Sequence, residues 1–199
     1  MPPTTTEVPP VGQVQPQPAR PGDRCCLVIF GASGDLTKRK LLPSLYNLAK
    51  KDLLPKEFAL VGCANQTFSE EEFRKQLRAD LTQFAGAPER CKFCDWLIER
   101  LYYLAGDFQD PAYYQSLKPL LEGVAEKHGT QGNYFYYLAT TPTLFGEVVR
   151  QLGTAGLTEE SGGQWRRIVF EKPFGHDLDS ARALNREIKQ VLSGSDLSY

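Results

Sequence analysis

A short apolar run that ends in a glycine-rich turn constrains the fold of this chain more than any other feature. The run is Cys25–Phe30, and Gly31-Ala32-Ser33-Gly34-Asp35-Leu36 follows it directly. Glycines at such a junction let the backbone approach a diphosphate, and the N-terminus of the following helix supplies N–H donors and the positive end of its dipole. The pattern therefore predicts a strand, a nucleotide-binding turn and a helix.

This turn has two alternative interpretations. The full dinucleotide fingerprint has one glycine more, and two glycines can serve the geometry of a strand-to-helix turn in any α/β protein. A Walker-type loop fits worse, because Leu36-Thr37-Lys38-Arg39-Lys40 lacks the Gly-Lys-Ser/Thr ending.

Strand and helix patterns alternate along the rest of the chain. Strands are expected at 25–30, 58–62, 101–105, 134–139 and 167–170, with amphipathic helical stretches between and after them. In these helical stretches, Leu48 is expected on the apolar stripe of the first, Ser69 and Glu72 as the capping box that opens the second, and Asp179 as the cap of the last. Parallel strands need crossover connections, so the alternation predicts an α/β fold with a doubly wound, mainly parallel, Rossmann-like sheet. The carboxyl ends of such strands converge on ligands, which brings together 31–36, 63–66, 106–108, 140–142 and 172–175.

Composition sets the domain organisation. Seven of the 14 prolines lie in residues 1–23, which we expect to be a disordered tail, with one domain over 24–199. A net charge of −1 gives no nucleic-acid footprint, and the Lys38, Arg39, Lys40 cluster has no interleaved aromatic residues. No apolar run is long enough to span a membrane and no targeting segment is evident, so a cytoplasmic location is expected.

Cysteines and histidines offer few further candidate sites. The chain has five cysteines, an odd number that argues for reduced thiols, and no metal site is expected. Cys91-x-x-Cys94 is the one tempting pair, but zinc needs two more ligands and a redox pair is expected near the start of a βαβ unit. Helical spacing with one buried thiol is the preferred explanation. His128 and His176 form no triad or metal pattern, so both are expected to be surface or capping residues.

Asn65 and Gln66 follow the second expected strand, where a dinucleotide-binding domain reads the adenosine ribose. An acid there favours NAD and an arginine favours NADP, but this chain has neither. Two amides can hydrogen-bond a hydroxyl or a phosphate, and an exposed polar loop is the plain alternative.

Lys172 lies at the end of the fifth expected strand and precedes Pro173. A lysine held there can donate hydrogen bonds to an anionic or hydroxylated substrate beside a coenzyme. In the alternative interpretation, Glu171 is its salt-bridge partner in a purely structural site.

Three motifs taken together carry a family resemblance. Residues 29–41 (Ile-Phe-Gly-Ala-Ser-Gly-Asp-Leu-Thr-Lys-Arg-Lys-Leu), 61–64 (Val-Gly-Cys-Ala) and 171–175 (Glu-Lys-Pro-Phe-Gly) closely resemble, in order and spacing, the amino-terminal half of glucose-6-phosphate dehydrogenases. The resemblance covers about residues 25–192 and leaves the proline-rich tail outside.

The resemblance implies an NADP-binding domain of the pentose phosphate pathway enzyme, which oxidises glucose 6-phosphate to 6-phosphogluconolactone by hydride transfer to the nicotinamide. Asp107 and Phe108 would lie near the adenosine, Lys172 would touch coenzyme and substrate, and Lys40 would favour the substrate's phosphate. The residues implied at the diphosphate are Gly31, Ala32, Ser33, Gly34, Asp35, Leu36, Thr37 and Lys38. Family members are commonly homo-oligomers.

Two departures from the family pattern qualify these expectations. Asn65 stands where many members have an arginine, which permits the use of NAD as well as NADP. The chain ends at Tyr199, before the family motif that holds the catalytic histidine, so we expect a fragment with little activity alone. The rival hypotheses are another NAD(P)-dependent oxidoreductase and a vestigial nucleotide-binding or interaction module.

Overall fold

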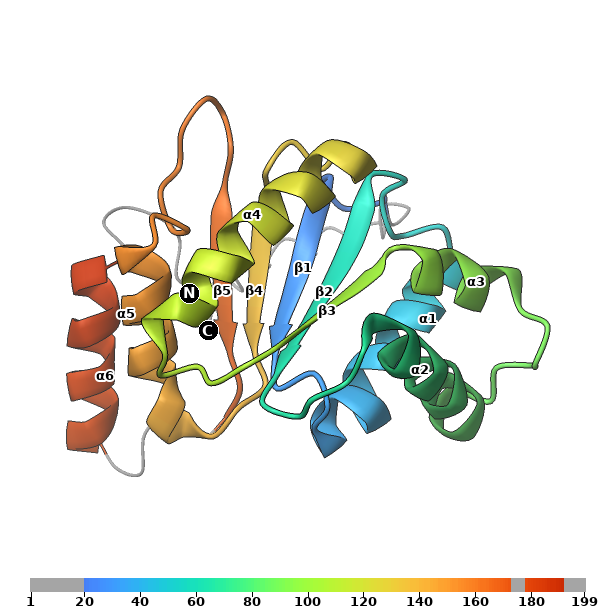
Figure 1. The fold of residues 1–199 in the computed structure, drawn as a ribbon, viewed down its shortest axis with the longest axis horizontal. Coiled ribbons are helices and arrows are strands. Elements are labelled where there is room, and N and C mark those ends of the chain that lie inside the picture. Colours follow the sequence, from blue (N-terminus) through green and yellow to red (C-terminus); the bar gives the residue numbers. More distant parts are fainter. Residues whose placement is uncertain (1–19, 173–177, 192–199) are drawn as a thin grey trace, which may run out of the picture.

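Five strands form one parallel sheet in the order β3-β2-β1-β4-β5, and a computed structural model describes it through residues 20–172 and 178–191 (Figure 1). The strands are β1 Cys25–Phe30, β2 Phe58–Ala64, β3 Leu101–Ala105, β4 Tyr134–Leu138 and β5 Arg166–Phe170. The chain moves outward from β1 to β3, then crosses to β4 on the other side of β1. The predicted α/β fold with a doubly wound parallel sheet is confirmed.

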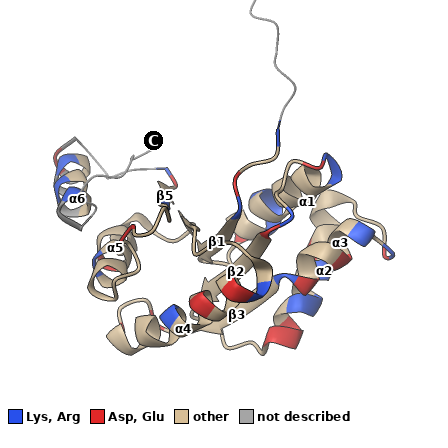
Figure 2. Ribbon diagram, turned by 90° about the horizontal axis from the view of Figure 1, so that it is seen from above, with Lys and Arg blue, Asp and Glu red and all other residues tan. Residues whose placement is uncertain are grey.

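Helices cover both faces of the sheet and give three layers (Figures 1 and 2). One face carries α1 Leu42–Lys50, α2 Glu70–Ala85 and α3 Lys92–Glu99, while α4 Pro111–His128 and α5 Phe145–Thr154 cover the other. The last helix, α6 Leu178–Val191, packs against α5. In Figure 2, charged residues of both signs mark the helices, whereas the strands are mostly uncharged.

The alternation of side chains along β1 explains the two hydrophobic cores. Cys26, Val28 and Phe30 pack toward α4 and α5, and Ile29 packs toward α1 and α2. Every residue of β2 is buried, as expected for a central strand covered on both faces.

Helix α2 begins as the sequence predicts. Ser69 and Glu72 form a reciprocal capping box, in which Glu72 N–H donates to Ser69 Oγ at 3.2 Å and Ser69 N–H donates to Glu72 Oε2 at 2.7 Å. The helix ends at Gly86, which has the left-handed conformation typical of a C-terminal cap.

Several expected boundaries and faces were wrong. The second strand extends to Ala64, and the fifth already begins at Arg166. The fourth strand ends at Leu138, although Ala139 N–H still donates to Phe30 O. Asp179, expected as a cap, lies inside the first turn of α6. Leu48 was expected on the buried stripe of the first helix but is 37% exposed, since it lies on the solvent side of α1.

The two edges of the sheet differ in how they are closed. We call the edge where the strands end the carboxyl edge, and the edge where they begin the amino edge. At the amino edge Asn133 bridges two strands: its Nδ2 donates to Arg24 O at 3.0 Å, and its Oδ1 accepts from Trp165 N–H at 3.1 Å. Arg166 is also buried there and donates to the Gly132 and Trp165 carbonyls.

Within the described ranges, none of the helices is both long and apolar enough to cross a membrane.

Candidate functional site

The glycine turn brings the ends of β1 and β4 into direct contact. Gly31 has a φ of +93°, and a Cβ added there would lie 2.4 Å from the Ala139 carbonyl oxygen. Ala139 N–H in turn donates to Phe30 O at 2.8 Å. Only glycine fits this close approach, which places the turn at the point where the strand order reverses.

Several amides of the turn are already engaged within the protein. Gly31 N–H and Ala32 N–H both donate to Cys63 O, at 2.8 and 3.0 Å, and Gly34 N–H donates to Gly31 O at 3.0 Å. Gly31 and Ala32 therefore supply geometry rather than donors. An anion at this turn would be bound by donors from Ser33 and from the start of the following helix.

That helix opens with a π-helical turn, η1 Thr37–Leu41, in which Leu42 N–H reaches Thr37 O. Thr37 is 1% exposed, and its Oγ1 donates to Gly31 O at 3.1 Å, which ties the first helical turn to the end of β1. Asp35 and Arg39 pair on the exposed side at 2.6 Å. π-Turns inside helices are rare and often accompany functional sites.

A cleft of about 340 Å³ opens at the carboxyl edge above β1, β2, β3 and β4. The residues that line it come from four segments, at the ends of β1, β2, β3 and β4, and are mostly small or polar: Gly31, Ser33, Gly34, Ala64, Asn65, Asp107, Phe108, Gln109, Ala139, Thr140, Thr141 and Leu144. Its position at the switch point of a doubly wound sheet is where such folds bind ligands.

Phe108 gives the cleft an ordered wall. Its ring packs edge-on against Phe30 with the centroids 5.2 Å apart, and it is 7% exposed. Asp107 Oδ1 accepts from Gln109 N–H at 2.9 Å, which shapes the loop that leads into α4. The cleft is thus preformed by packing and by loop hydrogen bonds.

Comparison with known proteins agrees with this geometry. The family model for the NAD-binding domain of glucose-6-phosphate dehydrogenase matches residues 28–197. The chain belongs to the glucose-6-phosphate dehydrogenase family. Glucose-6-phosphate 1-dehydrogenase of Aggregatibacter actinomycetemcomitans is 44% identical over 168 residues, which are 83% of this chain and 33% of that protein. The Bacillus subtilis enzyme is 38% identical over 85% of this chain and 33% of its own length.

Solved structures of the same family share the fold. The Mycobacterium avium glucose-6-phosphate 1-dehydrogenase superposes with a TM-score of 0.72 at 32% identity, over 87% of this chain and 35% of that one. A glucose-6-phosphate dehydrogenase in complex with glucose 6-phosphate gives 0.73 at 27% identity, over 89% and 36%. The chain spans about a third of the length of the relatives it matches.

The structure brings some of the predicted site residues together and leaves others apart. Those that line the cleft are Gly31, Ser33, Gly34, Asn65, Asp107 and Phe108. Those that lie outside its lining are Ala32, Asp35, Leu36, Thr37, Lys38, Lys40, Gln66 and Lys172. Gln66 follows Asn65 on an exposed loop, and its carbonyl accepts from Tyr103 Oη at 2.5 Å.

Lys172 is exposed at the end of β5. Its neighbour Glu171 does not pair with it, as the alternative interpretation expected, but has another partner. Tyr137 Oη donates to Glu171 Oε1, and burial and this bond raise the pKa of Tyr137 above its ordinary value. Glu171 is therefore held by β4, and among the described ion pairs none joins it to Lys172. Pro173, Phe174, Gly175 and His176 lie outside the described residues.

Ala64, Thr140 and Thr141 line the cleft and lie in the segments expected to converge at the strand ends. The cleft residues outside those segments are Gln109, Ala139 and Leu144. Leu144 and Gln109 could not be predicted, because only the packing of η2 Pro142–Leu144 and of the loop before α4 brings them to the cleft.

The remaining candidates lie elsewhere. His128 ends α4 at the amino edge, where its Nε2 is 2.8 Å from Tyr102 Oη. Cys91 and Cys94 are both buried, which corrects the expectation that only one thiol would be. α3 packs against both α1 and α2, so neither side of the pair faces water. Within the described ranges, no three His, Cys, Asp or Glu side chains come together as metal ligands.

Proposed function

We propose that this chain is the coenzyme-binding domain of a glucose-6-phosphate dehydrogenase and binds NADP in the cleft at the carboxyl edge. The observation that carries the proposal is the convergence of the glycine turn with the ends of β2, β3 and β4 around one cleft, in a member of this family. Small residues line the side of the turn, where a diphosphate must come close to the backbone.

The diphosphate would be bound along residues 31–38. Gly31 sets the turn, Thr37 ties the helix start to it, and Ser33 and the first helical amides donate to the phosphate oxygens. Asp35 is paired with Arg39, so its charge is partly compensated beside the anion. The residues present therefore fit a dinucleotide.

The adenosine end would lie near Asn65, Gln66, Asp107 and Phe108. No carboxylate follows β2 at the place where an acid would repel a 2′-phosphate, which supports NADP. The Asn65 and Gln66 amides donate to a phosphate without adding positive charge, so NAD is also accepted, with a smaller preference than an arginine would give.

Lys172, with Lys40, would bind glucose 6-phosphate. The bound coenzyme supplies the acceptor for the hydride removed from C1 of the sugar. An exposed ammonium with no ion pair to Glu171 is available to hold substrate oxygens in line, and such positioning is a large share of catalysis. Among the described residues the one histidine is His128, which lies at the opposite edge and cannot act as a base in the cleft, so we expect little turnover from this chain alone.

The test is a calorimetric titration of the folded chain with NADP and, separately, with NAD. We expect saturable binding of both, with NADP tighter. The variant Asn65→Arg should raise the NADP-over-NAD ratio by about tenfold, the scale of a charge-assisted hydrogen bond. Absence of binding by a demonstrably folded chain would favour a vestigial module.

A further inference from the structure

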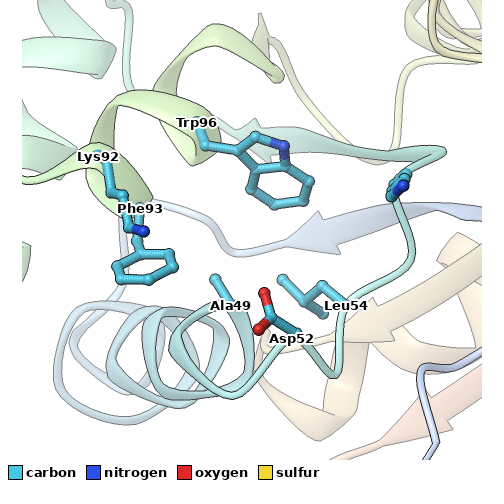
Figure 3. Close-up of a pocket in the computed structure, with 7 residues that line it drawn as sticks. Ala49, Asp52, Leu54, Lys92, Phe93 and Trp96 are labelled. Atoms are coloured by element: carbon cyan, nitrogen blue, oxygen red, sulfur yellow. The ribbon is translucent and has the colours of Figure 1, made fainter.

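A cavity of about 350 Å³ lies between the end of α1 and helix α3, and it shares no lining residue with the cleft at the carboxyl edge. Figure 3 shows the Phe93 and Trp96 side chains of α3 across the cavity from Ala49 and Leu54. The two rings are three residues apart on one helix, so they lie on the same face. Two aromatic rings in the wall suit the cavity to an apolar group. The rest of the lining consists of charged residues of both signs: Asp52, Lys56 and Lys92.

Trp96 is held in place by its neighbours, but its indole N–H is unused. Phe58 stacks on the indole with the ring centroids 6.0 Å apart, and the guanidinium carbon of Arg100 lies 4.4 Å from the ring centroid. The side chain is half-buried, and among the described residues none accepts a hydrogen bond from the indole N–H. A buried tryptophan usually finds such a partner, so this N–H is available to the carbonyl of a ligand.

The chain enters the sheet directly beside this cavity. Gly22 N–H donates to Leu53 O at 3.2 Å, and the next residue, Leu54, belongs to the cavity wall. Cys25 N–H also donates to Glu57 O at 3.2 Å, so the incoming chain follows the segment that forms one side of the cavity. Residues a few positions before Gly22 are therefore within reach of the aromatic rings.

The residues before Gly22 have the composition of a polyproline ligand. Seven of the chain's 14 prolines precede it. Such segments favour the polyproline II helix, whose carbonyls make no internal hydrogen bonds and whose proline rings dock against aromatic side chains. In that conformation Pro18 and Pro16 would lie about 12 and 19 Å along the chain from Gly22, at roughly 3.1 Å per residue. Both can reach a cavity that begins beside Leu53.

We propose that this cavity is a docking site for the chain's own N-terminal segment, with Pro16 and Pro18 packed against Phe93 and Trp96 and a carbonyl of the segment accepting from the Trp96 indole N–H. A short tether gives the segment an effective concentration of about millimolar, which favours it over a free ligand. Residues 13–19 carry no charge, so docking depends on apolar contact and should not be released by salt. Docking would order only the part of the predicted tail nearest the domain.

NMR of the full chain tests the proposal through the indole N–H resonances. The chain has two tryptophans, and Trp165 is also half-buried but does not line this cavity, so it serves as an internal reference. We expect the double variant Pro16→Gly, Pro18→Gly to shift the Trp96 indole resonance and to speed its hydrogen exchange, while Trp165 stays as in wild type. Both prolines precede the described residues, so their replacement removes no described contact.

The matched control is the double variant Pro9→Gly, Pro10→Gly. It removes as many prolines from the same segment, but farther from Gly22, and the Trp96 resonance should remain as in wild type. A Trp96 resonance that does not respond to loss of Pro16 and Pro18, or that responds equally to the control, would overturn the proposal.

A peptide titration then identifies the occupant of the cavity. A synthetic peptide of residues 13–20 should move the Trp96 resonance of the Pro16→Gly, Pro18→Gly variant at a concentration at least about tenfold lower than wild type requires, because the tethered segment of wild type competes. An equal response of both proteins would show that the cavity is open in wild type and takes a proline-rich segment of another protein. A wild-type Trp96 resonance that changes on dilution would assign the site to the segment of a second copy. Either result, or no response by the variant, contradicts the proposal.

Discussion

The two edges of the sheet are closed by different means. At the carboxyl edge, the ends of β1 and β4 meet backbone to backbone, because Gly31 has no side chain and Ala139 donates to Phe30 O. At the amino edge, buried side chains join the loops: Asn133 bonds to Arg24, 109 positions away in the sequence, and Arg166 links the start of β5 to Gly132.

This difference places residues important for stability at the amino edge and residues available for ligand binding at the carboxyl edge. Buried polar side chains with two or more partners are costly to remove, since each deletion leaves unsatisfied groups behind. A cleft lined by backbone and small residues exposes donors to a ligand but adds little cohesion. Substitutions at the amino edge should therefore weaken folding and spare coenzyme binding, and most substitutions in the cleft should do the reverse.

Gly31→Val should have the largest effect on stability. It is the exception among the cleft substitutions, because it should weaken folding as well as binding. The new Cβ would lie 2.4 Å from Ala139 O on a backbone with φ +93°. We expect the free energy of unfolding to fall by roughly 3 kcal/mol or more, measured by urea denaturation. Gly123→Ala is the matched control, because no atom lies within 4 Å of its added Cβ, and it should not destabilise. Equal stability of both variants would contradict the described contact.

Asn133→Ala should have the next largest effect. It removes both hydrogen bonds that join Arg24 O and Trp165 N–H, and we expect a loss of about 2–3 kcal/mol of unfolding free energy. Asn133→Asp keeps the acceptor and should lose less. The NADP affinity of either folded variant should stay within about twofold of wild type. A large loss of affinity with unchanged stability would break the proposed separation of the two edges.

His128 should contribute a smaller, pH-dependent effect at the same edge. Burial, with Arg100 and Lys127 nearby, lowers the pKa of His128, so the unfolded chain binds its proton more readily than the folded chain does. Its contribution to stability is complete above the ordinary histidine pKa and is lost as pH falls through the lowered value. Urea denaturation across this range should show a shallower pH dependence for His128→Gln than for wild type. If His128→Gln shows the same pH dependence of stability as wild type, then groups other than His128 cause that dependence.

Sequence reasoning reached the carboxyl edge more readily than the amino edge. The glycine turn and the strand ends are local signals, and parallel strand topology then forces them together. The bridging role of Asn133 could not be predicted, because it depends on a hydrogen bond to Arg24, 109 positions away in the sequence. The cavity between α1 and α3 was also not predicted, because it depends on how Phe93 and Trp96 of α3 lie against residues of and after α1.

The engaged amides of the turn were also beyond prediction. The sequence resemblance implied that Gly31 and Ala32 would line a diphosphate, but their N–H groups donate to Cys63 at the end of β2. Only the register between β1 and β2 reveals this, and no local pattern encodes that register.

The most direct test of the account is an NADP titration of the wild-type chain beside Gly34→Leu. Gly34 lines the cleft, and an added Cβ would lie 3.1 Å from Gly31 O, a tight contact that requires a small backbone shift. The variant should therefore fold with some loss of stability while its side chain occupies the diphosphate position. We expect saturable binding by wild type and binding at least about tenfold weaker by the variant, with cooperative urea unfolding of both proteins. Equal affinities in two folded proteins, or no binding by either, would contradict the assignment of the glycine turn as the coenzyme site.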